Sequence, residues 1–184
     1  MCRYSFKNYK IHFACFDCRK SFKKLPSYDL MKANGDWTIY SKAFVGYNRL
    51  RAKNFRKANP EIVEQLLSKY QNREEKCPEC SKLMVNVGKD FKAPKKEKKK
   101  EWRILQGLYD SGVSFGSCGC NSIGYVPRTM RDYVAYLEQE KQYYQTRLIS
   151  RTAKSQKERL PDYIERFEKR LHLIEKELNL ITNE

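Results

Sequence analysis

The chain has 184 residues, 40% hydrophobic and 13% aromatic, which is enough apolar material for a folded core and excludes a wholly disordered protein. No segment approaches the roughly 20 apolar residues that span a bilayer. The formal net charge is +16, and residues 1–128 carry almost all of it, with 27 Lys and Arg against 12 Asp and Glu. Such a basic region attracts polyanions, chiefly nucleic acid, and otherwise acidic proteins or anionic membranes.

The first residues, MCRYSFKNYK, lack the apolar run of a secretory signal peptide. We therefore expect a cytoplasmic protein with no membrane partner. The chain has seven cysteines, and thiols stay reduced in that compartment. Close cysteine pairs then indicate metal ligands or catalysis before disulfides.

Short strands are predicted in the first part of the chain. Residues 9–14 and 83–88 both show apolar alternation, which is typical of strands. Residues 36–40 and 42–47, DWTIY and KAFVGY, are predicted as two further short strands, preceded by a turn at the Asn-Gly pair 34–35.

Helical patterns follow. A helix is predicted over residues 60–73, with Asn59 as its cap and Pro60 in its first turn. Residues 89–100 are predicted to form a solvated Lys-rich linker, which leads into a short helix over 101–109. A loop rich in glycine and serine then carries Cys118 and Cys120.

From Thr129 onwards the pattern changes to heptads. Thr129 and Asp132 have the spacing of a helix cap, and apolar residues recur at alternating steps of four and three from 130 to 148 and from 160 to 181. Residues 129–184 are therefore predicted to form an antiparallel, coiled-coil-like helical hairpin. Pairing within one chain is favoured, although heptads also allow two chains to pair.

Two cysteine pairs carry the chemistry: CFDC at residues 15–18 and CPEC at residues 77–80. A tight turn with two residues between its cysteines aims both sulfurs at one ion, and two such turns supply the four thiolates that Zn²⁺ prefers. A redox dithiol is the alternative, but no strand-helix unit of the thioredoxin kind follows Cys15. Arg19, Lys20, Lys76 and Lys82 flank the pairs, where they can offset thiolate charge.

The segments CFDCRK and CPECSK resemble the two knuckles of the zinc-ribbon family, which has many small bacterial members. The resemblance implies that Cys15, Cys18, Cys77 and Cys80 bind one zinc ion and that residues 19–76 are a long insertion. The predicted fold class is α+β: residues 1–128 form a small zinc-ribbon β domain with a helical insertion, and residues 129–184 form the hairpin. Cys2, Cys118 and Cys120 are candidates for a second metal site.

The basic residues suggest the partner. Lys and Arg neutralise phosphates, and the aromatic residues Tyr47, Phe55 and Trp102 among them could stack on unpaired bases. The candidate nucleic-acid-binding residues are Arg19, Lys20, Arg49, Arg51, Lys53, Arg56, Lys57, Lys95, Lys96, Lys98, Lys99 and Lys100.

We therefore expect a non-enzymatic nucleic-acid-binding protein with a structural zinc site. RNA is favoured, ribosomal RNA included, because no base-reading DNA module is visible. One alternative is an adaptor that binds a protein partner, or a second copy of itself, through the hairpin. A nuclease or nucleotide-modifying enzyme with an accessory zinc ribbon is a further alternative, but its usual cluster of carboxylates or histidines is missing from the sequence.

Overall fold

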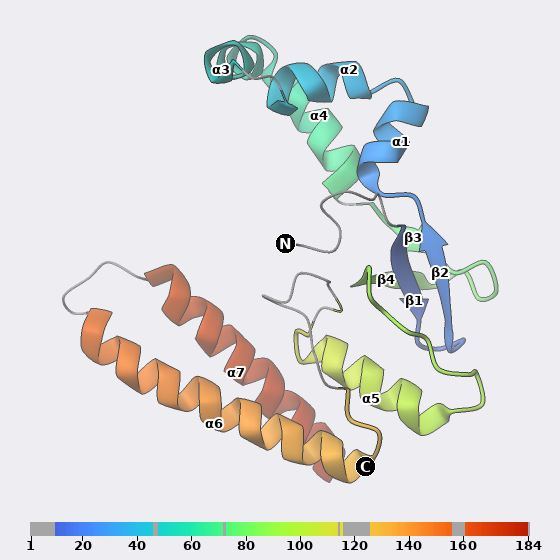
Figure 1. The fold of residues 1–184 in the computed structure, drawn as a ribbon, viewed down its shortest axis with the longest axis vertical. Helices are drawn as coiled ribbons and strands as arrows, with labels where there is room; N and C mark the ends of the chain where they lie inside the picture. The colour runs from blue at the N-terminus through green and yellow to red at the C-terminus, as the bar shows by residue number, and fades with distance from the viewer. Residues whose placement is uncertain are drawn as a thin grey trace.

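The computed structural model describes residues 10–45, 48–71, 73–113, 115, 126–155 and 161–183. Its fold is mixed α and β, as the sequence predicts, with a small sheet at the centre of the molecule (Figure 1). The strands are β1 (Ile11–Cys15), β2 (Lys20–Lys24), β3 (Glu75–Lys76) and β4 (Leu83–Gly88). They pair antiparallel in the order β2-β1-β4-β3. The predicted strands at 9–14 and 83–88 are thus present as β1 and β4.

Both faces of the sheet are covered. Along β1, Phe13 and Cys15 face the cysteine cluster together with Met84 of β4, whereas Ala14 packs with Val87 against the opposite core. In β4, Met84 and Val87 are buried, whereas Leu83 is 54% exposed. A strand that is covered on both sides buries residues of both parities, so simple alternation does not identify its inner face.

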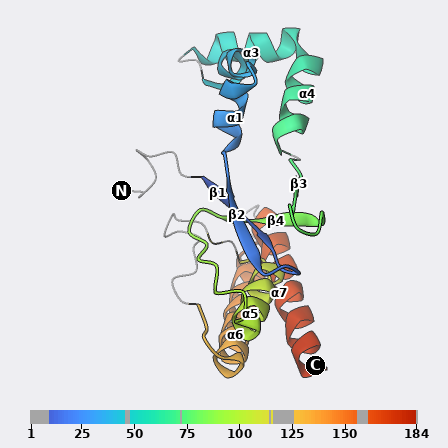
Figure 2. The same cartoon turned by 90° about the vertical axis from the view of Figure 1, so that its right-hand side faces the viewer.

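The described part of the segment between β2 and β3 contains helices joined by short turns and no strand. Its elements are α1 (Ser27–Ala33), α2 (Trp37–Tyr40), a π-helix η1 (Ser41–Val45), α3 (Arg49–Ala58) and α4 (Pro60–Gln71). Together they project from one end of the sheet, as Figures 1 and 2 both show. We call residues 27–71 the helical insertion.

The two strands predicted at 36–40 and 42–47 are a mistaken assignment, since α2 and η1 occupy the described part of these residues. Aromatic residues favour strands only weakly, because packing decides their conformation. Trp37, Tyr40 and Phe44 are spaced by three and four residues, which is a helical period.

The predicted turn at 34–35 is present, and Gly35 adopts the left-handed conformation (φ 77°) that glycine tolerates. The predicted helix at 60–73 is α4, and Pro60 begins it. Asn59, the predicted cap, directly precedes α4: its carbonyl accepts a hydrogen bond from the Val63 amide at 3.2 Å, and its side-chain amide donates to the Phe55 carbonyl at 3.0 Å, at the end of α3.

One hydrophobic core joins the sheet to the C-terminal helices. Helix α5 (Lys99–Asp110) packs against the sheet and also against α6 (Met130–Ser155) and α7 (Pro161–Thr182). Fully buried members of this core are Val87, Phe91, Ile104, Leu108, Tyr133, Leu137 and Ile174. The predicted parts 1–128 and 129–184 therefore share a core.

The C-terminal helices confirm the predicted pairing within one chain, since α6 and α7 pack along each other (Figure 1). The predicted cap is also present: the Asp132 amide donates to Thr129 Oγ1 at 3.1 Å. In the described part of the chain, no helix combines the length and the apolar character needed to cross a membrane.

Candidate metal centre

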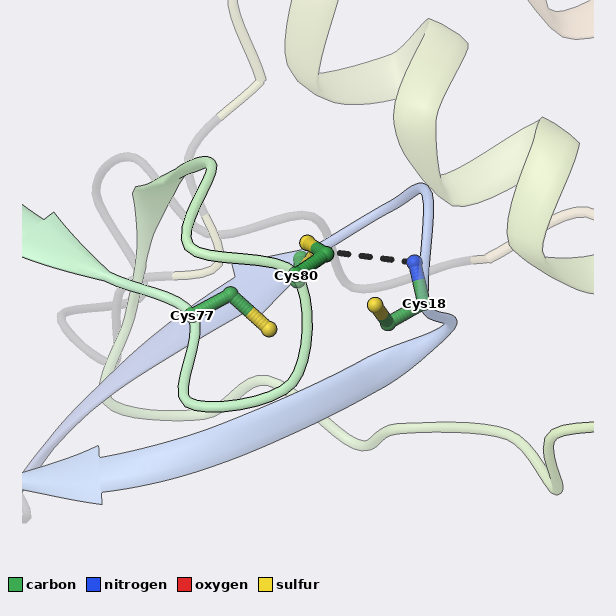
Figure 3. Close-up of side chains that lie close together, drawn as sticks. Cys18, Cys77 and Cys80 are labelled. Atoms are coloured by element: carbon green, nitrogen blue, oxygen red, sulfur yellow. Dashed lines mark hydrogen bonds between the residues drawn. The ribbon is translucent and has the colours of Figure 1, made fainter.

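The sheet brings the two cysteine pairs together. Cys15 ends β1 and Cys18 lies in the turn to β2, while Cys77 follows β3 and Cys80 lies in the turn to β4. Because β1 and β4 are neighbours, the 58 intervening residues do not separate the pairs in space. Figure 3 shows the side chains of Cys18, Cys77 and Cys80 extending from these two turns into a common space.

The spacing of the sulfurs suits a metal ion. The four Sγ atoms lie within 4.8 Å of one another, and those of Cys15 and Cys80 are 3.6 Å apart. Four sulfurs at 2.3 Å from a tetrahedral zinc ion would lie about 3.8 Å apart. Cys15 and Cys77 are buried, and Cys18 and Cys80 are partly exposed. The cluster could therefore hold a metal ion such as zinc with only small adjustments.

The two turns share a backbone conformation. The residue after the second cysteine of each pair has a positive φ, 54° at Arg19 and 59° at Ser81. This left-handed conformation is uncommon for residues other than glycine. The Ser81 amide donates to the Cys77 carbonyl at 2.8 Å, and the Arg19 amide donates to the Phe16 carbonyl at 3.3 Å. The same tight turn is thus built twice, which directs both pairs of thiols to one point.

Backbone amides also donate to the sulfurs. The Cys18 amide lies 3.5 Å from Cys15 Sγ, in the geometry of an N–H···S bond. Burial opposes ionisation of Cys77, but the amides of Cys80 and Glu79 and the neighbouring thiols lower the pKa of its thiol to about 7. Cys77 therefore ionises before Cys15 and Cys18.

Cys15 and Cys18 resist ionisation in this cluster. Burial raises the pKa of Cys15, and the hydrogen bond with Cys80, followed by burial, raises the pKa of Cys18 to about 12. Sulfurs this close cannot all carry a negative charge unless a cation compensates them. The chemistry of the donor set thus fits a divalent metal ion.

Two ion pairs connect the turns to each other. Lys82 Nζ lies 2.7 Å from Asp17 Oδ1, and Lys20 pairs with Glu79. Each pair joins the acidic residue inside one turn to the lysine that follows the other turn. The hydrogen bond with its partner raises the pKa of each lysine. Lys20 and Lys82 are predicted from the sequence as flanking cations, whereas Asp17 and Glu79 are not. The repeated pattern Cys-x-acid-Cys-x-Lys is the signal that identifies these two acidic residues.

The Lys-rich segment lies beside the first cysteine turn. Arg19 Nε donates to the Lys96 carbonyl at 3.0 Å, and the Trp102 indole donates to the Lys95 carbonyl at 3.2 Å. Phe91 anchors the start of the segment in the core. Its lysines are exposed, and the last two, Lys99 and Lys100, begin α5. We call Arg19 together with Lys95, Lys96, Lys98, Lys99 and Lys100 the knuckle-side basic surface.

The other predicted nucleic-acid-binding residues lie elsewhere. Helix α3 carries Arg49, Arg51, Lys53, Arg56 and Lys57. This helix is at the far end of the helical insertion, with the sheet between it and α5 in both views (Figures 1 and 2). The structure therefore divides the predicted residues into two separate basic surfaces. Lys20 belongs to neither surface, because it forms an ion pair with Glu79.

Of the aromatic residues predicted to stack on bases, Trp102 is unsuitable. It is 2% exposed and belongs to the central core. Phe55 is partly buried, and Tyr47 lies outside the described residues. Exposed aromatic rings occur instead at Tyr28 and Phe44, which the sequence analysis did not single out.

The candidate second metal site lies outside the described residues, since Cys2, Cys118 and Cys120 all belong to ranges that the structure does not describe. His12 lies on β1, where its ring meets Phe91 edge-on and burial lowers its pKa. Among the residues that are described, the four cysteines are the one group of metal-ligating side chains that converge.

Comparison with protein-family models, with curated proteins and with solved structures finds no match to this chain. What the cysteines hold must therefore be inferred from their own geometry. That geometry combines four converging thiols, two turns of the same conformation and reciprocal ion pairs between the turns.

Proposed function

We propose that this chain is a zinc-ribbon protein in which Cys15, Cys18, Cys77 and Cys80 bind one structural Zn²⁺. The observation that carries the proposal is the convergence of four thiols from two turns of the same build. Four thiolates complete the tetrahedral sphere of zinc and leave no open position for a substrate. The metal would therefore stabilise the fold, and its role in this chain would be structural.

Charge balance supports the zinc assignment. A zinc ion with four thiolates carries a net charge of −2, which nearby cations offset. Lys20 and Lys82 follow the two turns, and both approach the thiols closely enough for the cysteines to raise the pKa of each lysine. The acids Glu79 and Asp17 hold these lysines in place.

The function we propose is nucleic-acid binding, with RNA favoured over DNA and ribosome association as one setting. The knuckle-side basic surface supports this, because its lysines are exposed and the fold holds its backbone in place through Arg19 and Trp102. Within the described residues, Lys98 alone among these lysines has an acidic partner, Glu101 at 3.6 Å. Cations held on a rigid support suit the phosphate backbone of a folded RNA.

The test is binding of labelled RNA to the zinc-loaded protein across a salt series. Replacing Lys95, Lys96 and Lys98 with Gln is expected to weaken binding and to reduce the salt slope by about 2, because each phosphate contact contributes about 0.7 to 0.9. Replacing Arg166, Lys169 and Lys176 of α7 with Gln removes the same charge from another exposed surface and should leave the slope unchanged. Equal effects of the two sets would refute a specific role for the knuckle-side basic surface.

A second candidate function is protein binding by the helical hairpin. Large apolar side chains are exposed on its helices, namely Tyr143 (48%), Ile149 (73%) and Leu180 (48%). A helix that packs along the hairpin would cover these side chains. Light scattering of the full chain would show a dimer if the partner is a second copy.

A further inference from the structure

Four aromatic rings form a continuous ladder across the helical insertion. Tyr28 contacts Trp37, Trp37 contacts Tyr40, and Tyr40 contacts Phe44, with ring centroids 4.4, 5.6 and 5.2 Å apart. The rings come from α1, α2 and η1, so the ladder joins consecutive elements of the insertion. We call these four residues the aromatic ladder.

The ends of the ladder are exposed. Tyr28 is 36% exposed and Phe44 is 39% exposed, while Trp37 and Tyr40 are half-buried. The buried core of the insertion consists of other residues, Met31, Leu66 and Tyr70, and Tyr40 alone of the ladder packs against it. The two outer rings are therefore partly accessible at the surface.

Cations lie over these rings. Lys32 Nζ is 4.4 Å from the centroid of Tyr28, and the guanidinium carbon of Arg56 is 5.5 Å from the centroid of Phe44. Such cation–π contacts hold positive charge beside the ring. Each end of the ladder thus combines an exposed ring with a cation.

A pocket of about 580 Å³ lies between η1 and α3, and it is lined by residues next to Phe44 in the sequence but by none of the four ladder rings. Lys42 and Arg51 line it together with polar Ser41 and the ring of Phe55. Its volume is in the range of small-ligand sites, which spans about 300 to 1,000 Å³. The π-helix η1 supplies both this pocket and Phe44, and π-helical turns occur frequently at functional sites.

The charge around the ladder identifies the kind of ligand. Residues 28–60, which include all four rings, contain seven Lys and Arg and two acidic residues, Asp29 and Asp36. Asp36 is paired with Lys69 at 2.7 Å. Among the described side chains, no ion pair neutralises Arg49, Arg51, Lys53 or Lys57. A ligand that combines negative charge with flat aromatic faces matches this surface.

From this juxtaposition we propose that the helical insertion is a binding site for single-stranded nucleic acid. Unpaired bases would stack on Tyr28 and Phe44, and phosphates would lie against Lys32, Arg51 and Arg56. The proposal rests on the nucleic-acid-binding function proposed above and assigns part of it to a second surface, distinct from the knuckle-side basic surface. An acidic protein would be attracted by the positive charge of this surface, but it would give the exposed aromatic rings no role in binding.

The test measures binding of a fluorescein-labelled oligouridylate to the full-length, zinc-loaded protein. Replacing Tyr28 and Phe44 together with Leu keeps apolar side chains but removes both exposed rings. Affinity is expected to fall at least about fivefold, because stacking on one aromatic side chain contributes at least that factor. Tyr163→Leu is the matched control, since Tyr163 is 46% exposed but lies on α7.

The salt series separates the contribution of base stacking to the affinity from the contribution of phosphate contacts. The Tyr28→Leu/Phe44→Leu variant should lose affinity at every salt concentration with the salt slope unchanged, whereas Arg51→Gln should reduce the slope by about 0.7. Circular dichroism and zinc content should match the unmodified protein in all variants, which shows that the insertion remains folded.

The outcomes distinguish the two proposals. If the unmodified protein binds RNA and the loss of both rings leaves oligouridylate affinity unchanged, the ladder site is refuted while the proposed function stands. If the unmodified protein binds neither RNA nor DNA, the proposed function fails and the ladder site fails with it. Binding of an acidic peptide at the ladder without binding of oligouridylate would likewise refute the site and identify a protein partner.

Discussion

Asp17 and Glu79 occupy the same position in the two cysteine turns, and each pairs with the lysine of the opposite turn. Exposed ion pairs contribute little to global stability. These pairs nevertheless connect two turns that must hold one ion, so their effect should appear in metal retention.

We predict that Glu79→Lys speeds the transfer of zinc to a competing chelator, because it places two positive charges against each other across the turns. Adding Lys20→Glu restores an attractive pair and should slow the transfer again. Glu97→Lys is the charge-matched control in the Lys-rich segment. Identical transfer rates for all these variants would show that the reciprocal pairs do not hold the turns together.

Gly107 is required by a close contact between α5 and the hairpin. Glu177 is 3% exposed and accepts hydrogen bonds from Tyr133 at 3.0 Å and from Arg103 at 2.6 Å. A Cβ atom at Gly107 would overlap both the Glu177 carboxylate and the Tyr133 hydroxyl. The buried Glu177 carboxylate is tolerated because Tyr133 and Arg103 both donate hydrogen bonds to it.

We predict that Gly107→Ala lowers the free energy of unfolding by about 1–3 kcal/mol, the usual cost of overpacking a core. Helix propensity alone would raise the free energy of unfolding of the alanine variant by up to about 1 kcal/mol. A decrease would therefore indicate overpacking, and an increase would indicate that helix propensity dominates. Denaturant titration measures it, with the exposed neighbour Gln106→Ala as the control. A stabilised Gly107→Ala protein would contradict the close packing.

At the scale of elements, Asp36 connects the helices of the insertion. It accepts hydrogen bonds from Lys69 at 2.7 Å and from the Tyr70 hydroxyl at 2.5 Å. The Lys69 ammonium, followed by the Tyr70 hydroxyl, lowers the pKa of Asp36 below its ordinary value of 3.8. The folded chain therefore binds a proton at Asp36 less readily than the unfolded chain does.

This linkage predicts a pH dependence. The stabilisation from Asp36 is present above pH 3.8 and is lost as the pH falls through the lowered pKa. Asp36→Asn should therefore reduce stability at neutral pH, and the difference from the unmodified chain should disappear in strong acid. Comparing the two chains at each pH cancels the loss of zinc that acid also causes. A difference that is independent of pH would contradict the assignment.

The cysteine pairs, β4, α4 and the C-terminal helices could be predicted from the sequence because each depends on a local pattern. The helical conformation of residues 37–45 could not be predicted, because aromatic residues occur in either state and packing in the insertion favours helix. The reciprocal ion pairs join segments about 60 residues apart, so their geometry depends on how the sheet brings the two turns together. The aromatic ladder joins neighbouring elements, but it forms only because residues 37–45 are helical.

At the scale of the whole molecule, the helical insertion is separable from the metal site. Its core of Met31, Leu66 and Tyr70 is distinct from the central core. Its ends also lie together, because Lys24 at the end of β2 forms an ion pair with Glu75 of β3 at 3.0 Å. A short linker could therefore replace the insertion.

We predict that replacing residues 27–71 with a short Gly-Ser linker preserves zinc binding. The same change should abolish the stacking contribution to oligouridylate binding while the knuckle-side basic surface still binds RNA. Elemental analysis and the salt series measure these two effects. Loss of zinc from the shortened chain would show that the insertion is needed to form the metal centre.

The zinc content of the purified full-length chain tests the central claim most directly. Elemental analysis should find that a Cys18→Ser/Cys80→Ser variant holds one zinc ion fewer per chain than the unmodified protein. This difference is independent of any metal at Cys2, Cys118 and Cys120. Equal zinc contents in the two proteins, or no zinc in the unmodified chain, would contradict the zinc-ribbon assignment.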